Sequence, residues 1–260
     1  MPRTRPLSRT VLGAALTTVL VSGCTDGGGD ASPLSGKRNT SPDRGVTLSA
    51  RLDTPTDVTL RWNGRDPEAA GQIVEFATEP RGAYTILEFA PGGQSLFKHP
   101  DLMPRTPFYY RLRAYGGPVS PAVDIALPKG TLGRKDQNRS HEWAVPRKLS
   151  KAGSAAERHR VRGENTDRAA PTRLRATVKH ANGVLLTWRD QARDEDGYLV
   201  EVRPEGAADF RVAAVLDPDI ESTGLITLPQ EKRASIRVRA FFYGDRSNVV
   251  HRTTGEQSAG

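Results

Sequence analysis

Cysteine is almost absent from this sequence, since Cys24 is the only one in 260 residues. A single cysteine cannot form an intramolecular disulfide, a Cys-X-X-Cys redox pair or a thiolate cage for a metal ion. The folded part of the chain must therefore be stabilised by the packing of its apolar side chains.

Enzyme motifs are missing as well. The five histidines are scattered, and there is no HExxH zinc motif, G-x-S-x-G nucleophile elbow or glycine-rich phosphate loop. The run Asp194, Glu195 and Asp196 resembles a calcium loop, but the EF-hand spacing would need an acid at Ala192 and a glutamate at Arg203. We interpret it as an acidic surface turn. The sequence thus predicts no catalytic residue, no cofactor and no metal site, and hence a protein that is not an enzyme.

A basic face is not indicated either, although the formal net charge is +8. Three arginines lie in residues 1–23, and residues 129–170 hold 11 Lys and Arg against 5 Asp and Glu. The rest of the chain sums to −1. The charge pattern that usually marks a nucleic-acid-binding surface is therefore absent, and no nucleic-acid partner is expected.

The N-terminal region has the composition of a secretory signal peptide. Its arginines precede residues 11–22, which are uncharged and mostly Ala, Leu, Val and Thr. This run is too short to span a bilayer, which takes about 20 apolar residues. We expect residues 1–23 to be a signal peptide, and residues 24–44, rich in Gly, Ser, Asp and Pro, to be a flexible tether.

The residues Val21, Ser22, Gly23 and Cys24 resemble the lipobox of bacterial lipoproteins. In that family the cysteine receives a diacylglyceryl group before cleavage, so the resemblance implies that Cys24 is lipidated and becomes the mature N-terminus. Each buried methylene adds about 0.8 kcal/mol, so two acyl chains anchor a protein durably. The expected location is the extracytoplasmic face of the cell membrane, with the membrane as a partner. The alternatives are a plain signal peptide with an incidental cysteine, or a leader that is cut elsewhere.

An internal repeat covers about two thirds of the chain. A shift of 126 residues places Trp62 in DVTLRWNGRDPEAAGQIVEF on Trp188 in GVLLTWRDQARDEDGYLVEV. Without a gap, the same shift aligns Leu48 with Leu174, Ala50 with Ala176, Val74 with Val200, Glu75 with Glu201, Arg111 with Arg237, Arg113 with Arg239 and Ala114 with Ala240. We interpret residues 45–128 and 171–254 as two copies of one module, followed by a tail at 255–260.

Each copy has the pattern of short strands. Apolar and polar residues alternate in both, which puts one row inward and the other toward water. Turn residues recur every 8 to 12 positions or so, as Asn63-Gly64, Pro91-Gly92-Gly93, Gly116-Gly117-Pro118, Asn182-Gly183 and Gly244-Asp245. With no long helical pattern between them, these strands favour an antiparallel β-sandwich.

Several stretches resemble fibronectin type III modules. In the second copy PTRLRATVKHANGVLLTWRD is similar to strands A and B, DEDGYLVEVRP to strand C, and RVRAFFYGDRSN to strand F with a short turn into strand G. In the first copy LMPRTPFYYRLRA resembles the run into strand F. The resemblance implies an all-β protein of two immunoglobulin-like sandwiches. It departs at the E–F corner, where Phe108 and Ala234 replace a tyrosine; Tyr109 is expected to point to the opposite face.

The resemblance also implies roles for the aligned residues. Trp62 and Trp188 are expected in the cores rather than as sugar-stacking platforms. Strand F should lie beside strand C, which would pair the outward Glu75 and Glu201 with arginines of strand F. Those arginines are Arg111, Arg113, Arg237 and Arg239. We expect a solvated charge ladder worth about 0.2–1 kcal/mol per pair, rather than a binding patch.

Residues 129–170 form a polar, basic linker. They contain too few apolar side chains to offset the entropy of ordering, so we expect a mostly disordered spacer. Around Trp143 we expect either a short element docked on a module or a contact point for a partner. The alternative to a spacer is attraction to anionic wall polymers or lipid headgroups. The candidate polyanion contacts are Arg134, Lys135, Arg147, Lys148, Arg158, Arg160 and Arg162.

Together these features predict a membrane-anchored lipoprotein whose tandem modules act as a binding or spacer device at the cell surface. Its partner would be an unidentified protein or a cell-wall polymer. Two alternatives stay open: an accessory or catalytic protein acting on cell-wall or extracellular polysaccharide, and a polyanion-binding protein that acts through the linker.

Overall fold

The structure is a computed structural model, and it describes residues 45–64, 66–130, 133–137, 140–149, 158–163 and 166–255. The predicted signal peptide, Cys24 and the tether lie outside the described residues. Within the described ranges, no helix has the length and apolar character needed to cross a membrane.

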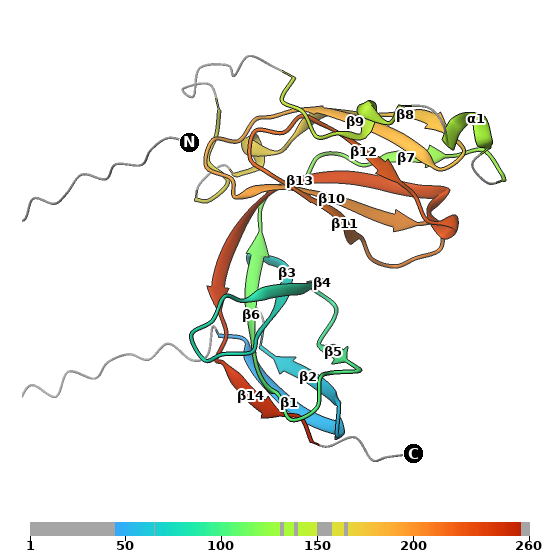
Figure 1. The fold of residues 1–260 in the computed structure, drawn as a ribbon. Helices are drawn as coiled ribbons and strands as arrows, with labels where there is room; N and C mark the ends of the chain where they lie inside the picture. Colours follow the sequence, from blue (N-terminus) through green and yellow to red (C-terminus); the bar gives the residue numbers. More distant parts are fainter. Residues whose placement is uncertain are drawn as a thin grey trace, which may run out of the picture. The chain divides into compact units, whose positions relative to one another are not determined.

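Strands make up most of the described chain (Figure 1). The first copy contains β1 (Thr47–Thr54), β2 (Asp57–Asn63), β3 (Ala69–Ala77), β4 (Thr85–Pro91), β5 (Leu96–His99), β6 (Pro107–Gly116) and β7 (Val123–Ala126). The second contains β8 (Thr172–His180), β9 (Gly183–Arg189), β10 (Gly197–Pro204), β11 (Arg211–Leu216), β12 (Ser222–Ile226), β13 (Arg233–Arg246) and β14 (Val250–Thr253). The short helices are α1 (Arg134–Gln137), η1 (Glu142–Ala144), η3 (Thr166–Ala169) and η4 (Pro229–Glu231).

The strands pair into antiparallel sheets that enclose two main cores. The sheets β1-β2-β5 and β12-β9-β8 each form one layer of a sandwich. The other layers belong to one eight-stranded sheet of order β11-β10-β13-β6-β3-β4, with β14 on β6 and β7 on β13. Trp62 and Trp188 lie in the two cores with 8% and 4% of their surface exposed, which confirms their expected role. Strand F also lies beside strand C as expected, since β6 pairs with β3 and β13 with β10.

The last strand of each copy belongs to the other sandwich. β7 follows the first copy but pairs with β13, with Ile125 opposite Ala234. β14 ends the second copy but pairs with β6, with His251 opposite Tyr109. The contiguous segments 45–128 and 171–254 therefore do not close on themselves, because each takes its final strand from the other.

This exchange overturns two of the predicted turns. β13 continues as a strand through Gly244-Asp245, and after β6 the chain passes Gly117-Pro118 to Val119, which still bridges Arg239 of β13. Both F strands thus run straight on instead of folding back as hairpins (Figure 1). A small third core of Ile73, Tyr115, Leu199 and Phe241 lies where the two strands cross.

Gly117 permits the crossing because its backbone lies against β13. Its φ is +121°, and a Cβ there would lie 2.0 Å from the carbonyl oxygen of Ala240. The carbonyl of Gly117 in turn accepts a hydrogen bond of 2.5 Å from Nη1 of Arg239. Sequence reasoning took the glycines as turn formers, whereas Gly117 serves here in a close approach of two backbones.

The E–F corner of the first sandwich is tied by the exchanged end of the chain. Phe108 is buried, and Tyr109 lies on the other face and stacks on His251 at 4.7 Å between ring centroids. In place of a tyrosine hydroxyl, Oγ1 of Thr254 accepts a hydrogen bond of 2.9 Å from the Thr106 amide. The same hydroxyl lies 2.5 Å from the carbonyl oxygen of Met103 and donates to it. The loop between β5 and β6 is therefore held by the residue that follows β14.

The exchange predicts which engineered cysteines cross-link. In a Cys24→Ser background, we expect Tyr109→Cys and His251→Cys to form a disulfide within one chain, because the two positions face each other. Without exchange, β14 would pair with β13 in the way that β7 does. The repeat shift of 126 residues aligns His251 with Ile125, so His251 would then face Ala234. The matched pair Ala234→Cys and His251→Cys should therefore stay reduced. Non-reducing electrophoresis decides: a disulfide in the second pair alone would contradict the exchange.

Part of the linker docks on the second sandwich through Trp143. A Cβ on Gly224 of β12 would lie 2.6 Å from the Trp143 ring and 2.4 Å from Cα of Ala144. The Trp143 ring also meets the His180 ring edge-on at 5.4 Å between centroids. Of the two expectations for Trp143, the structure shows the short element docked on a module.

Other described linker residues are also packed. The amide of Arg147 donates to the Ser222 carbonyl at 2.8 Å, and the Ser222 amide donates back at 3.1 Å. Val161 and Ala169 are 1% and 0% exposed. The expectation of a mostly disordered linker is wrong for these described residues, because the edge of β12 supplies hydrogen-bond partners and the second core accepts the apolar side chains.

The charge ladder is buried rather than solvated. Glu75 and Glu201 are 4% and 3% exposed, and each faces its predicted arginine, Arg111 or Arg237, with a contact of 2.5 Å. Arg111 lies over the Tyr84 ring and Arg237 over the Phe210 ring, at 3.7 and 4.0 Å from the centroids. The pairing is confirmed for Arg111, Arg237 and Arg239, whereas Arg113 lies over the Tyr243 ring. The expected solvation is wrong, because the rings of Tyr84 and Phe210 cover the pairs.

Candidate functional site

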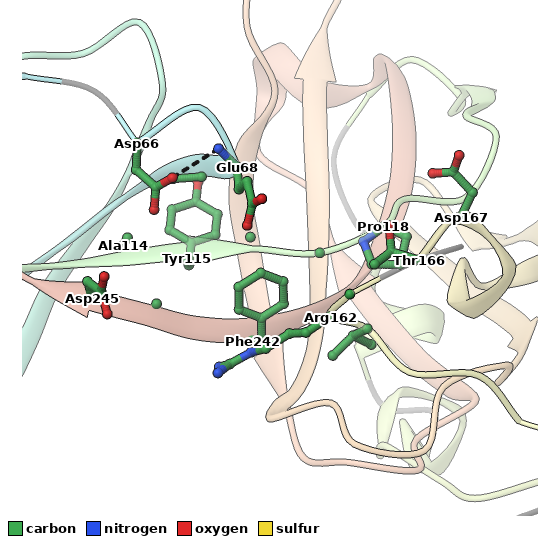
Figure 2. Close-up of a pocket in the computed structure, with 16 residues that line it drawn as sticks. Asp66, Glu68, Ala114, Tyr115, Pro118, Arg162, Thr166, Asp167, Phe242 and Asp245 are labelled. Atoms are coloured by element: carbon green, nitrogen blue, oxygen red, sulfur yellow. Dashed lines mark hydrogen bonds between the residues drawn. The ribbon is translucent and has the colours of Figure 1, made fainter. Parts of the chain in front are cut away.

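A cavity lies beside the strand crossing, and we call it the crossing cavity (Figure 2). Its volume is about 540 Å³. β6 contributes Tyr115 and Gly116, β13 contributes Phe242, and the loop between β2 and β3 contributes Glu68. The linker contributes residues before and within η3, among them Arg162. Both sandwiches and the linker therefore line this single space.

The lining of the crossing cavity is mainly acidic. Asp66, Glu68, Asp167 and Asp245 face one cationic side chain, Arg162. Glu68, Asp167 and Asp245 are exposed, so their charges remain solvated. A cationic group is therefore favoured in the cavity and an anionic polymer is opposed.

The aromatic residues of the cavity provide contact area and a neutral donor. The guanidinium of Arg162 lies 4.4 Å from the centre of the Phe242 ring and also donates to the carbonyl of Tyr243. Tyr115 is 3% exposed, and burial raises the pKa of its phenol to about 12. Because this phenol stays protonated at neutral pH, it is a hydrogen-bond donor and not a nucleophile. The described lining holds no histidine, serine or cysteine from which a nucleophile and base could be assembled.

A second polar site lies at one end of the second sandwich, and we call it the Arg158 cluster: Arg158, Asp190, Glu195 and Asp219. Nη1 of Arg158 lies 2.6 Å from Oδ2 of Asp190 and 2.7 Å from Oδ1 of Asp219. The Tyr198 hydroxyl donates to the other oxygen of Asp190. The linker residue Arg158 thus joins the loop after β9 to the loop after β11.

Burial and hydrogen bonding shift the pKa values of the carboxyls in this cluster in opposite directions. Removal from water raises the pKa of Asp190 and of Glu195, because the charged form loses hydration. Hydrogen bonds from Arg158 and Lys148 instead lower the pKa of Asp219. The expectation of an acidic surface turn holds for the exposed Asp194 and is wrong for Glu195, which is only 8% exposed.

The candidate polyanion residues do not behave alike. Arg158 forms ion pairs with Asp190 and Asp219 in the cluster, and only 15% of its side chain is exposed. Lys148 pairs with Asp219 at 2.9 Å, and Arg147 donates to the Glu142 carbonyl at 3.0 Å. Arg162 lies at the crossing cavity. The remaining three, Arg134, Lys135 and Arg160, are exposed.

Sequence reasoning did not single out Asp190 or Asp219, and of the cavity residues it proposed only Arg162 as a binding residue. Asp190 and Asp219 lie in different loops and meet only because the sandwich brings those loops to one end. Phe242 was read as part of strand F, and nothing in its spacing indicated a cavity. The available signals were Arg158 and Arg162, two basic residues in a segment that was expected to stay in solvent, and Glu195 in the predicted acidic turn.

Comparisons with known proteins give no family assignment. No family model matches the chain, and no curated protein matches it. Among solved structures, it is similar to a two-domain fibronectin type III segment of chicken tenascin, with 13% identity and a TM-score of 0.25 over 82% of this chain and 99% of that one. It is also similar to the FN1–FN3 domains of chicken CNTN1, with 14% identity and a TM-score of 0.26 over 82% of this chain and 67% of that one. The antiparallel β-sandwich architecture is shown by the strand pairing itself.

Proposed function

We propose that this protein is a lipid-anchored binding module of the extracytoplasmic membrane face, and that it binds its ligand in the crossing cavity. The observation that carries this proposal is that both sandwiches and the linker line one cavity of about 540 Å³. Ligand pockets typically measure about 300–1,000 Å³ and occur preferentially at domain interfaces. A spacer alone would need no shared cavity.

The sequence around Cys24 supports the location. A diacylglyceryl group on this cysteine would anchor the chain, and a flexible tether of about 20 residues spans about 25 Å, enough to lift the first sandwich off the membrane. Cell fractionation tests this step: the wild-type chain is expected with the membranes and the Cys24→Ser chain in the soluble fraction. Recovery of the variant with the membranes would contradict the anchor.

Affinity capture with two matched variants tests the site. The variant Glu68→Gln with Asp245→Asn removes two charges from the cavity. The control Glu79→Gln with Asp217→Asn removes two exposed charges elsewhere, so the net charges of the two variants are equal. We expect envelope components captured by the wild-type mature chain to fall at least tenfold with the first variant and to persist with the control, as measured by quantitative mass spectrometry.

Each other outcome contradicts part of the proposal. Equal capture by both variants would place binding outside the cavity. If the wild-type chain captured nothing specifically, the protein would be interpreted as a spacer rather than as a binding module. We propose no enzymatic activity, and turnover of cell-wall or chitin-like polymers by the same purified chain would favour the polysaccharide alternative instead.

A further inference from the structure

Three carboxylates converge in the Arg158 cluster from three points of the second sandwich. Asp190, Glu195 and Asp219 each offer one oxygen, and these oxygens all lie within 4.8 Å of one another. Oxygens about 2.4 Å from a common centre satisfy this spacing, and 2.3–2.6 Å is the range of calcium–oxygen distances. Three carboxylates close together do not by themselves bind a cation. Whether they do depends on the groups that surround their oxygens.

The group now at the centre is one guanidinium nitrogen with more acceptors than hydrogens. Nη1 of Arg158 faces Oδ2 of Asp190, Oδ1 of Asp219 and the carbonyl oxygen of Ala192, the last at 3.2 Å. A guanidinium NH₂ carries two hydrogens, so three oxygens share two donors. The shell therefore holds more oxygen ligands than Arg158 can satisfy.

Glu195 provides the second, independent observation. The residue is 8% exposed, and its Oε2 is buried with no hydrogen-bond partner. Its other oxygen accepts a long hydrogen bond of 3.2 Å from the Asp219 amide. A buried carboxylate oxygen without a partner is costly, so its position beside two other carboxylates favours the binding of a cation there.

The charge balance agrees. Asp190, Glu195 and Asp219 bring three carboxylates to the cluster. Among the described residues, the cations that contact these three acids are Arg158 and Lys148, and the Lys148 side chain is 59% exposed. Three acids thus face two bases, one of them largely in water.

We propose that the Arg158 cluster is a binding site for a divalent cation, Ca²⁺ by its chemistry, which competes with the guanidinium of Arg158. The ligands would be Asp190, Glu195 and Asp219 with the carbonyl of Ala192. All of these ligands are oxygens, whereas zinc sites are built mainly from His nitrogen and Cys sulfur. They come from loops and form no rigid octahedron, which suits Ca²⁺ better than Mg²⁺. The sequence predicted no metal because it was compared with EF-hand spacing, whereas these ligands come from two separate loops.

Binding would also change the linker. Residues 158–163 are held on the second sandwich by Arg158, by the bridge of His159 with Ala192, and by a hydrogen bond of 2.8 Å from the Val161 amide to Asp194. A cation that takes the place of Arg158 removes the first of these attachments. The site would therefore couple Ca²⁺ concentration to the attachment of the linker segment that runs toward the crossing cavity.

Terbium luminescence tests this proposal on the full mature chain. Tb³⁺ is a Ca²⁺ substitute that is excited through nearby aromatic rings, and Tyr198, which bonds Asp190, lies 5.7 Å from Trp188 between ring centroids. We expect sensitised emission from the wild-type chain that Ca²⁺ displaces in the range of about 0.1–1 mM, as for extracellular calcium modules, and that Mg²⁺ displaces less well.

Three variants sharpen the test. Arg158→Gln removes the competing cation, so the Ca²⁺ dissociation constant should fall at least tenfold. Glu195→Gln should abolish the emission. Asp217→Asn removes an exposed acid two residues from Asp219 and should change nothing.

The proposal is overturned if neither the wild-type chain nor Arg158→Gln binds Tb³⁺ or Ca²⁺ at millimolar concentration. It is also overturned if Glu195→Gln binds as the wild-type chain does. Should Arg158→Gln fail to fold, thermal unfolding of the wild-type chain decides instead. Ca²⁺ but not Mg²⁺ at about 5 mM should raise its melting temperature, and an unchanged melting temperature would count against the site.

Discussion

Replacing Gly117 by alanine is expected to destabilise the whole protein by about 3–5 kcal/mol, a large share of the stability of an ordinary domain. Two costs add at this position. The backbone has φ +121°, where a side chain is strained, and the new Cβ would lie 2.0 Å from the Ala240 carbonyl oxygen. Both strands of the crossing must shift to make room. Urea unfolding followed by circular dichroism measures the change.

Gly130 offers a matched control for this substitution. Its φ is +103°, and a Cβ there would meet nothing within 4 Å. Gly130→Ala therefore carries the backbone cost of about 1–2 kcal/mol without the steric one. If Gly117→Ala were no more harmful than Gly130→Ala, the close approach of the two strands at the crossing would be wrong.

The fold class followed from the sequence because its causes are local. Alternation along β2 and β9 predicted strands, and the aligned Trp62 and Trp188 predicted two similar cores. The exchange of β7 and β14 did not follow. A strand G segment satisfies the same ladder of main-chain hydrogen bonds on either strand F, so alternation alone cannot say which partner it takes. The close approach of Gly117 to the β13 backbone is what marks a crossing rather than a turn. The positions of glycines along the sequence do not reveal such an approach.

The sites were less predictable for the same physical reason. Arg158 and Glu195 were both visible in the sequence, one as a solvated base and the other as an acid in a surface turn. Their burial depends on Asp190 and Asp219, which lie far from Arg158 in the chain and meet it only in the folded sandwich. Charge patterns indicate exposed residues on average, and they fail where opposite charges are brought together inside.

The second large effect is expected at Glu201, which holds two arginines in a nearly dry environment. Its Oε2 lies 2.5 Å from Nε of Arg237, and its Oε1 lies 2.7 Å from Nε of Arg239. Arg239 is 8% exposed and also donates to the Gly117 carbonyl. Glu201→Gln keeps the shape but leaves two guanidinium groups without a counter-charge. Because unpaired buried charge is severely penalised, we expect a loss of about 3–5 kcal/mol in the free energy of unfolding.

Two other glutamates set the scale for this prediction. Glu75 occupies the aligned position in the first copy and is equally buried, but it contacts one arginine, Arg111, so Glu75→Gln should cost less. Glu205 pairs with Arg233 at 2.8 Å at the exposed end of the same strand pair, and Glu205→Gln should leave stability almost unchanged. The expected order of destabilisation in urea unfolding is therefore Glu201, then Glu75, then Glu205. An equal effect at Glu201 and Glu205 would mean that water reaches the Glu201 pair, and that the aromatic cover over strand F is open in solution.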